Sequence, residues 1–262
     1  MQCNCSMGLF TSLDRAWLTI DSDIYVWRYE DGGDLAYFDG LSDTIFNVAM
    51  VKPKPGILQP HVINLLALST PVEIVLLGVS FSGDEMQLVP EPLFTLSADQ
   101  LHTSCIVGSE DGRIFMGGRD GHLYEFCYGS QDSWWGKKTE KICHTVGSFS
   151  WLLPNILGSL AEEDPILQIE IDETKHILYT RSEKGNVGVF YLGSDGQSMT
   201  RVASTTAQKL VEEASKLAAT VETGNLKPIV HIAVVQSVED ALIHLVAITG
   251  GGARLYLTTS SG

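Results

Sequence analysis

The stretch AWLTIDSDIYVW, residues 16–27, places two short apolar segments on either side of the polar triplet Asp21–Asp23. β-Branched and aromatic residues dominate both segments, and such residues favour strands. Two strands this close together with turn-forming aspartates between them predict an antiparallel β-hairpin. The two aspartates could also suggest a cation site, but turn formation is the commoner use of Asp at a hairpin, so we expect no metal there.

The same hairpin pattern recurs four more times along the chain. The copies occupy residues 65–77, 113–126, 176–191 and 243–257. Their turn markers, Asp23, Pro71, Gly121, Gly185 and Gly252, follow one another at spacings of 48, 50, 64 and 67 residues. A unit of about 48 residues is typical of a four-stranded propeller blade. The sequence therefore predicts an all-β fold, a partial β-propeller of about four to five blades over residues 15–262, preceded by an N-terminal segment, 1–14.

The two longer spacings each contain a segment of helical character, so we expect two helical insertions. The second insertion, residues 205–223, has an ordinary amphipathic pattern. Its apolar face consists of Leu210, Val211, Ala214, Leu217, Ala218 and Val221. Thr205 and Gln208 could form a capping box, and Glu212 with Lys216 an i,i+4 ion pair. We expect this helix to pack across the blades, with binding of a partner as the alternative.

The first insertion, residues 148–161, is unusual because no charged residue occurs between Lys141 and Glu162. A surface helix normally carries charges on its wet face, whereas the polar face here has only Ser, Asn and Gly. Such a face opposite large apolar residues is suited to a lipid interface. The candidate membrane contacts are Phe149, Trp151, Leu152, Leu153, Ile156, Leu157 and Leu160. The alternative is that these side chains pack into a groove of the propeller or of a partner.

Charge and composition narrow the classes of partner. The chain has a formal net charge of −15, which repels phosphate backbones and anionic headgroups. We therefore expect no direct contact with nucleic acid, and any membrane binding must come from apolar insertion. The five cysteines are scattered, and Cys3 with Cys5 has no second pair at zinc spacing, so free thiols are expected. The apolar run 62–81 is broken by a turn signal at Pro71 and predicts two buried strands rather than a membrane span.

Motifs that would indicate an enzyme are absent from the sequence. There is no G-x-S-x-G, no G-x-x-x-x-G-K and no H-E-x-x-H, and the seven histidines show no ligand spacing. Gly250–Gly252 lies between two strands, so it is not a phosphate-binding loop at the start of a helix. We expect no catalytic residue, no cofactor, no metal and no small-molecule substrate. A catalytic group assembled from distant residues remains the alternative.

Several long stretches resemble one known family. They are RAWLTIDSD at 15–23, YEDGGDLAYFDGL at 29–41, VKPK at 51–54, QPHV at 59–62, DPILQI at 164–169 and LYTRSEKG at 178–185. Together with the CNC of residues 3–5 they closely resemble the N-terminal propeller of the large non-FG nucleoporins of the inner ring, over nearly the whole chain.

The resemblance implies a structural scaffold component of the nuclear pore complex at the nuclear envelope, which supports nucleocytoplasmic transport of protein and mRNA. It also implies, as partners, other inner-ring scaffold and linker nucleoporins and a pore membrane protein. The family's membrane-binding loop is matched here by residues 148–157, which would contact the nuclear membrane. In that family a seven-bladed propeller precedes an α-helical solenoid, so we expect this chain to be a fragment or a short form. A generic propeller platform for protein interactions, unrelated to the pore, is the alternative.

Overall fold

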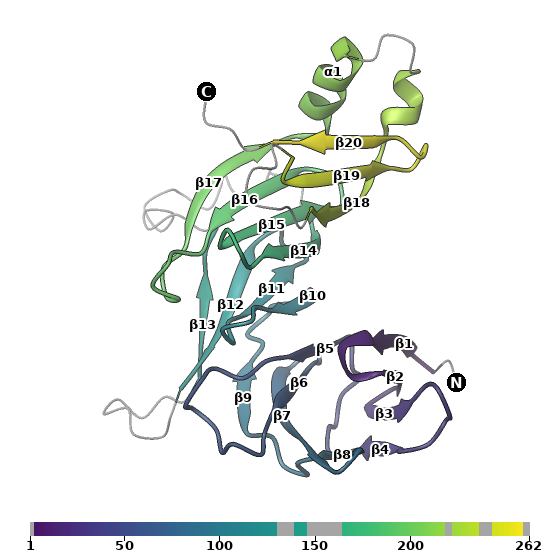
Figure 1. Ribbon diagram of the computed structural model, residues 1–262, viewed down its shortest axis with the longest axis vertical. Helices are drawn as coiled ribbons and strands as arrows, with labels where there is room; N and C mark the ends of the chain where they lie inside the picture. Colours follow the sequence, from purple (N-terminus) through teal and green to yellow (C-terminus); the bar gives the residue numbers. More distant parts are fainter. Residues whose placement is uncertain (1–2, 130–138, 146–163, 218–221, 236–242, 259–262) are drawn as a thin grey trace. The chain divides into compact units, whose positions relative to one another are not determined.

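The computed structural model describes residues 3–129, 139–145, 164–217, 222–235 and 243–258. Within these ranges the chain forms five antiparallel sheets and one α-helix (Figure 1). It divides into two compact units. The first comprises residues 1–116 and 124–142, and the second comprises residues 117–123 and 143–262.

Two sheets and most of a third belong to the first unit. The first sheet runs β1 (Cys5–Phe10), β2 (Arg15–Ile20), β3 (Asp23–Arg28) and β4 (Ala36–Phe38). The second contains β5 (Asn47–Val51), β6 (Asn64–Ser69), β7 (Glu73–Ser82) and β8 (Glu85–Leu88), with β9 (Phe94–Ser97) also paired to β7. The third runs β10 (Thr103–Gly108), β11 (Ile114–Gly118), β12 (Leu123–Tyr128) and β13 (Thr139–Cys143).

The second unit contains the remaining two sheets and the helix. One sheet runs β14 (Ile166–Asp172), β15 (Ile177–Ser182), β16 (Val187–Tyr191) and β17 (Thr200–Thr205). The other runs β18 (Ile229–Val234), β19 (Leu245–Thr249) and β20 (Arg254–Leu257). Helix α1 (Ala207–Leu217) follows β17, and a short 3-10 turn, Thr223–Leu226, precedes β18.

Each of the five expected hairpins lies in a different sheet, as the two middle strands of four sheets and as the last two strands of the three-stranded sheet. They are β2–β3, β6–β7, β11–β12, β15–β16 and β19–β20. The tight turns contain residues in the left-handed backbone conformation, including Asp21 with φ 52° and Gly185 with φ 80°. Strand β1 lies within the segment 1–14 and pairs with β2 along its whole length, from Cys5 opposite Ile20 to Phe10 opposite Arg15.

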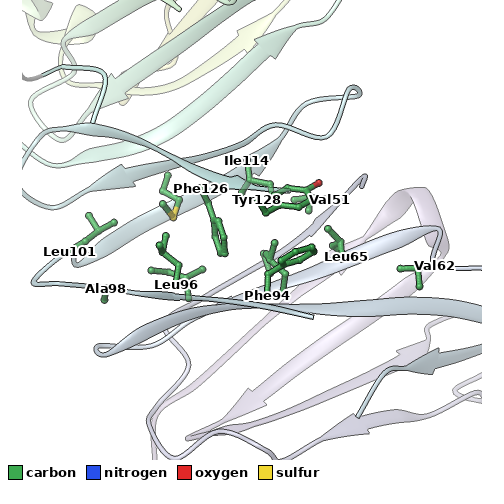
Figure 2. Packing of buried hydrophobic residues seen from close by; sticks show 14 residues of the cluster. Val51, Val62, Leu65, Phe94, Leu96, Ala98, Leu101, Ile114, Phe126 and Tyr128 are labelled. Atoms are coloured by element: carbon green, nitrogen blue, oxygen red, sulfur yellow. The ribbon is translucent and has the colours of Figure 1, made fainter. Parts of the chain in front are cut away.

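The apolar run 62–81 forms the centre of the first unit as strands β6 and β7. Residues alternate between the two faces of a strand, and both faces of β7 are buried. Ile74 and Leu76 join one apolar cluster, while Val75 and Leu77 join the other. Figure 2 shows the first cluster, where Phe94 and Leu96 of β9 meet Ile114, Phe126 and Tyr128 of β11 and β12. Within the described ranges, no helix has the length and apolar character needed to cross a membrane.

A buried ion pair lies in the third sheet. Arg113 and Glu125 are 1% and 4% exposed, and the guanidinium donates from Nε and Nη2 to the two carboxylate oxygens, each at 2.9 Å. The Arg113 guanidinium also lies 5.0 Å from the centre of the Phe115 ring. Burial acts to lower the pKa of Arg113, but the hydrogen bond and the charge of Glu125 outweigh it and raise that pKa.

The core of the second unit joins its two sheets to the helix. Tyr179, Val187 and Val189 of one sheet meet Ile232, Leu245 and Ala247 of the other in a single apolar cluster. Val211 of α1 is buried in the same cluster, and Leu210 and Ala214 pack against it. The amphipathic pattern therefore places α1 on these sheets through one face.

Helix α1 differs in three details from the sequence expectation. The capping residue is Thr206 rather than Thr205, since Thr206 Oγ1 accepts a hydrogen bond from the Lys209 amide at 3.2 Å and Thr205 ends β17. Lys216 pairs with Glu213 at 2.7 Å instead of with Glu212. Leu217 is 89% exposed, because it ends the helix beyond the sheets.

Of the two expected helical insertions, the described residues therefore contain one helix, α1, inside 205–223. The other insertion, 148–161, lies outside the described residues, and so do Ala218 and Val221. The architecture that the structure establishes is all-β, with five antiparallel sheets and this single helix among the described residues.

Candidate docking surface

The seven expected membrane contacts lie outside the described residues. They are Phe149, Trp151, Leu152, Leu153, Ile156, Leu157 and Leu160. The residues on either side of that segment, Thr145 and Asp164, are described, and both line one groove of about 1000 Å³ in the second unit, here called the polar groove.

Both flanking residues are held by hydrogen bonds. Thr145 Oγ1 lies 2.9 Å from Nδ1 of His122 and accepts from the Leu123 amide at 3.1 Å. The Asp164 carboxylate accepts from the Lys184 amide at 2.9 Å and from the Asn186 side chain at 2.7 Å. These bonds tie the two ends of the segment 146–163 to the turns of two hairpins.

Hydroxyl-bearing and charged side chains line the polar groove together with apolar ones. Its lining includes the buried Thr180, Ser182 and Phe190, with Arg201 and Lys209 at the side formed by β17 and α1. Ser182 Oγ is used within the fold, because it accepts a hydrogen bond from the Asn186 amide at 3.0 Å. This hydroxyl stabilises the turn between β15 and β16.

The two aspartates considered as a cation site, Asp21 and Asp23, lie at the turn between β2 and the start of β3. Asp21 Oδ1 accepts from the Asn4 amide at 3.0 Å, and Asp23 Oδ1 accepts from the Ser22 hydroxyl at 3.3 Å. Gly250–Gly252 forms the turn between β19 and β20. Over the described ranges, no group of three or more His, Cys, Asp or Glu side chains is placed to hold a metal ion.

A second groove of the second unit is apolar, and we call it the α1 groove. It has a volume of about 570 Å³ and is lined by residues of β15, β16, β17, α1, β19 and β20. Its members are Tyr179, Val187, Val189, Val202, Ala203, Ser204, Thr205, Lys209, Leu210, Glu213, Leu245, Leu257 and Thr258. Sequence reasoning missed this groove because its walls come from segments about eighty residues apart. The local signal is Val202, an apolar residue that stays 57% exposed in a strand.

Comparison with known proteins covers the whole chain. The nucleoporin N-terminal family model, described as Nup133 N terminal like, matches residues 1–262. The chain is 41% identical over 264 residues to the nuclear pore complex protein Nup154 of Drosophila melanogaster, covering 100% of this chain and 19% of the relative. It is 27% identical over 286 residues to nucleoporin NUP170 of Saccharomyces cerevisiae, covering 100% of this chain and 19% of that protein.

A solved structure is also similar. The crystal structure of the Chaetomium thermophilum Nup170 NTD–Nup53 complex matches with a TM-score of 0.84 at 25% sequence identity. The match covers 99% of this chain and 37% of that chain. Against the curated relatives, this chain spans about a fifth of their length.

Proposed function

The chain belongs to the nucleoporin N-terminal family of Nup133-like domains, and from that premise we propose that it is a structural scaffold part of the inner ring of the nuclear pore complex. The observation that carries the proposal is the match to the Nup170 N-terminal domain over 99% of the chain at a TM-score of 0.84. In this proposal the protein localises to the nuclear envelope and supports nucleocytoplasmic transport. It acts as a scaffold and not as an enzyme.

The five sheets are, in this proposal, consecutive blades of a β-propeller. Two features support it: within each sheet the strands follow one another in chain order, apart from the additional β9, and each sheet contains one of the five hairpins. Within the first unit both faces of β7 are buried against apolar clusters, as a blade between two neighbours requires. Five such sheets make part of a larger ring, with the insertions 148–161 and 205–223 between blades.

A linker nucleoporin is the partner that we propose first. The support is the similar structure, a complex of Nup170 NTD with Nup53. Other inner-ring scaffold nucleoporins and a pore membrane protein are proposed on the family resemblance. The test is affinity purification of the tagged chain from nuclear envelopes, followed by mass spectrometry. Enrichment of inner-ring nucleoporins is expected, whereas a generic propeller platform would not enrich them.

We also propose that the insertion 148–161 touches the pore membrane. Its support is the uncharged, apolar sequence together with the fixed positions of Thr145 and Asp164 on the polar groove. Full burial of a large apolar side chain contributes about 1.5–3 kcal/mol, of which a lipid interface realises only part. With no basic residue in the insertion to add attraction, binding depends on packing defects of curved bilayers. Many copies in one assembly would strengthen it by avidity.

Flotation with small phosphatidylcholine vesicles tests the membrane contact. The double variant Leu153→Asp, Leu157→Asp is expected to lose flotation. A matched control, Leu167→Asp with Val230→Asp, makes the same charge change at strand residues that are 39% and 44% exposed, and should float like the wild type. Equal flotation of the wild type and the insertion variant would favour the alternative, in which the insertion packs against protein.

A further inference from the structure

One face of the first sheet is apolar and largely exposed. Met7 of β1 stands opposite Leu18 of β2, and Leu18 opposite Tyr25 of β3. Tyr37 of β4 stands opposite Tyr25, so these four side chains lie in one row on the same face. Met7 is 73% exposed and Leu9 60%, whereas the opposite face of the sheet is buried in an apolar cluster. The exposed face, which we call the first-sheet face, consists of Cys5, Met7, Leu9, Ala16, Leu18, Ile20, Asp23, Tyr25, Trp27 and Tyr37.

The first-sheet face carries acidic but no basic side chains. Asp23 stands opposite Ile20 at one end of it. Desolvation, a hydrogen bond to Asp39 and the charge of Asp23 raise the pKa of Tyr37 to about 12, so both aspartates lie close to that hydroxyl. The two arginines of these strands, Arg15 and Arg28, stand opposite each other and alternate to the other side of the sheet.

The last sheet, β18–β20, has an exposed face with the complementary charge. Ala233, Val246 and Tyr256 form one row of it. Tyr256 is 57% exposed and Arg254 is also exposed, while the alternate residues of these strands are buried in the core of the second unit. We call this the last-sheet face, and it consists of His231, Ala233, Val246, Ile248, Arg254 and Tyr256. It is apolar, with a cation and no acidic side chain.

We propose that the first-sheet face of one copy of this chain binds the last-sheet face of a second copy. The apolar rows of the two faces pack as stacked sheets do, about 10 Å apart with interdigitating side chains. Arg254 of one copy then meets Asp23 and Asp39 of the other. This goes beyond the proposed function: in the larger ring, further blades would cover these faces, whereas in this chain by itself a second copy takes their place.

Charge complementarity selects this pairing of faces. Two first-sheet faces together would leave Asp23 and Asp39 without a cation, and two last-sheet faces would bring like arginines together. Only the mixed contact sets acids against a base. The net charge of −15 opposes any contact between copies, but at physiological salt this repulsion is screened beyond about 8 Å, whereas charges inside the contact are screened much less.

The size of the faces sets the expected strength. Strands β1, β2 and β3 have six residues each and β4 has three, so strands about 4.8 Å apart rising about 3.3 Å per residue give a face of roughly 400 Å². A standard stable interface buries about 800 Å² per partner. We therefore expect association with a dissociation constant of about 10 µM or weaker.

Sedimentation velocity of the whole chain between about 1 and 200 µM tests the contact. The mean mass is expected to rise with concentration. Met7→Asp with Leu9→Asp on one face, and separately Tyr256→Asp on the other, should each weaken association by about tenfold or more. The controls Val72→Asp and Val202→Asp change exposed valines outside both faces, which are 53% and 57% exposed, and should change it by less than about twofold.

A charge exchange separates the contact from a loss of folding. Asp23→Lys with Asp39→Lys in one variant, and Arg254→Glu in another, should each weaken association when alone. Mixing the two variants should restore it, because every mixed contact again joins opposite charges. Circular dichroism checks that all variants fold.

Three results would overturn the proposal. They are a chain that stays monomeric over the whole concentration range, association that Tyr256→Asp leaves unchanged, and a mixture of the charge variants that associates no better than either alone. The second result would favour a contact between two first-sheet faces.

Discussion

Replacing Glu125 by glutamine should strongly destabilise the first unit. The substitution leaves the shape of the side chain but removes the charge that holds the Arg113 guanidinium, which is 1% exposed. Two hydrogen bonds of 2.9 Å then lose their charge-assisted character, and a cation remains in the interior. Breaking a buried pair in this way costs about 3–5 kcal/mol. That is a large share of a typical domain stability of about 5–15 kcal/mol.

Urea unfolding followed by tryptophan fluorescence measures the effect. With a slope of about 3 kcal/mol per M, a loss of about 3 kcal/mol lowers the midpoint by about 1 M. The matched control is Glu110→Gln, because Glu110 pairs with Lys52 at the surface and its side chain is 62% exposed. An exposed pair contributes at most about 1 kcal/mol, so this midpoint should hardly move.

A double variant separates the pair from its burial. Arg113→Met with Glu125→Leu removes both charges and refills the space with apolar atoms, so it should recover most of the loss caused by Glu125→Gln. If Glu125→Gln shifts the midpoint no more than Glu110→Gln does, the charge of Glu125 is not what stabilises Arg113. The reasoning also fails if the double variant is less stable than the single one.

Three further predictions concern turns and the helix cap. Gly112→Ala should lower the free energy of unfolding more than Gly83→Ala does. Both glycines have positive φ, but only a Cβ at Gly112 would meet the backbone that follows β5. Urea unfolding of the two variants measures the difference, and equal midpoints would contradict it. Thr206→Ala should lower the free energy of unfolding by about 1 kcal/mol, and Thr205→Ala by less, because Thr206 caps α1. Urea unfolding of both variants shows which of the two is less stable. Hydrogen bonds from the backbone amides of Ser198 and Gln197 lower the pKa of Asp195 from 3.8 to about 2. The stability that the Asp195 carboxylate gives to its turn is therefore complete above about pH 4 and is lost as the pH falls through about 2. A titration midpoint near 3.8 in a carboxyl NMR experiment would refute this.

The strands of this protein follow from local sequence. Residues 16–27 form β2 and β3 because β-branched and aromatic residues lie on both sides of a tight turn, where Asp21 adopts a positive φ of 52°. The run 62–81 forms two strands because the turn before Glu73 interrupts it, so no helix could continue through it. Such features need only contacts between residues close in sequence, and the family resemblance rests on the same stretches.

Only the tertiary structure decided which residues meet across long separations. The α1 groove combines Tyr179 of β15 with Leu257 of β20, and the alternation of one strand says nothing about which later strand will cover it. The pairing of Arg113 with Glu125 depends on the register of β11 and β12, as the choice of Thr206 over Thr205 depends on where β17 ends. Sequence periodicity determined the hairpins, whereas packing between sheets determined the grooves, because burial depends on the whole fold.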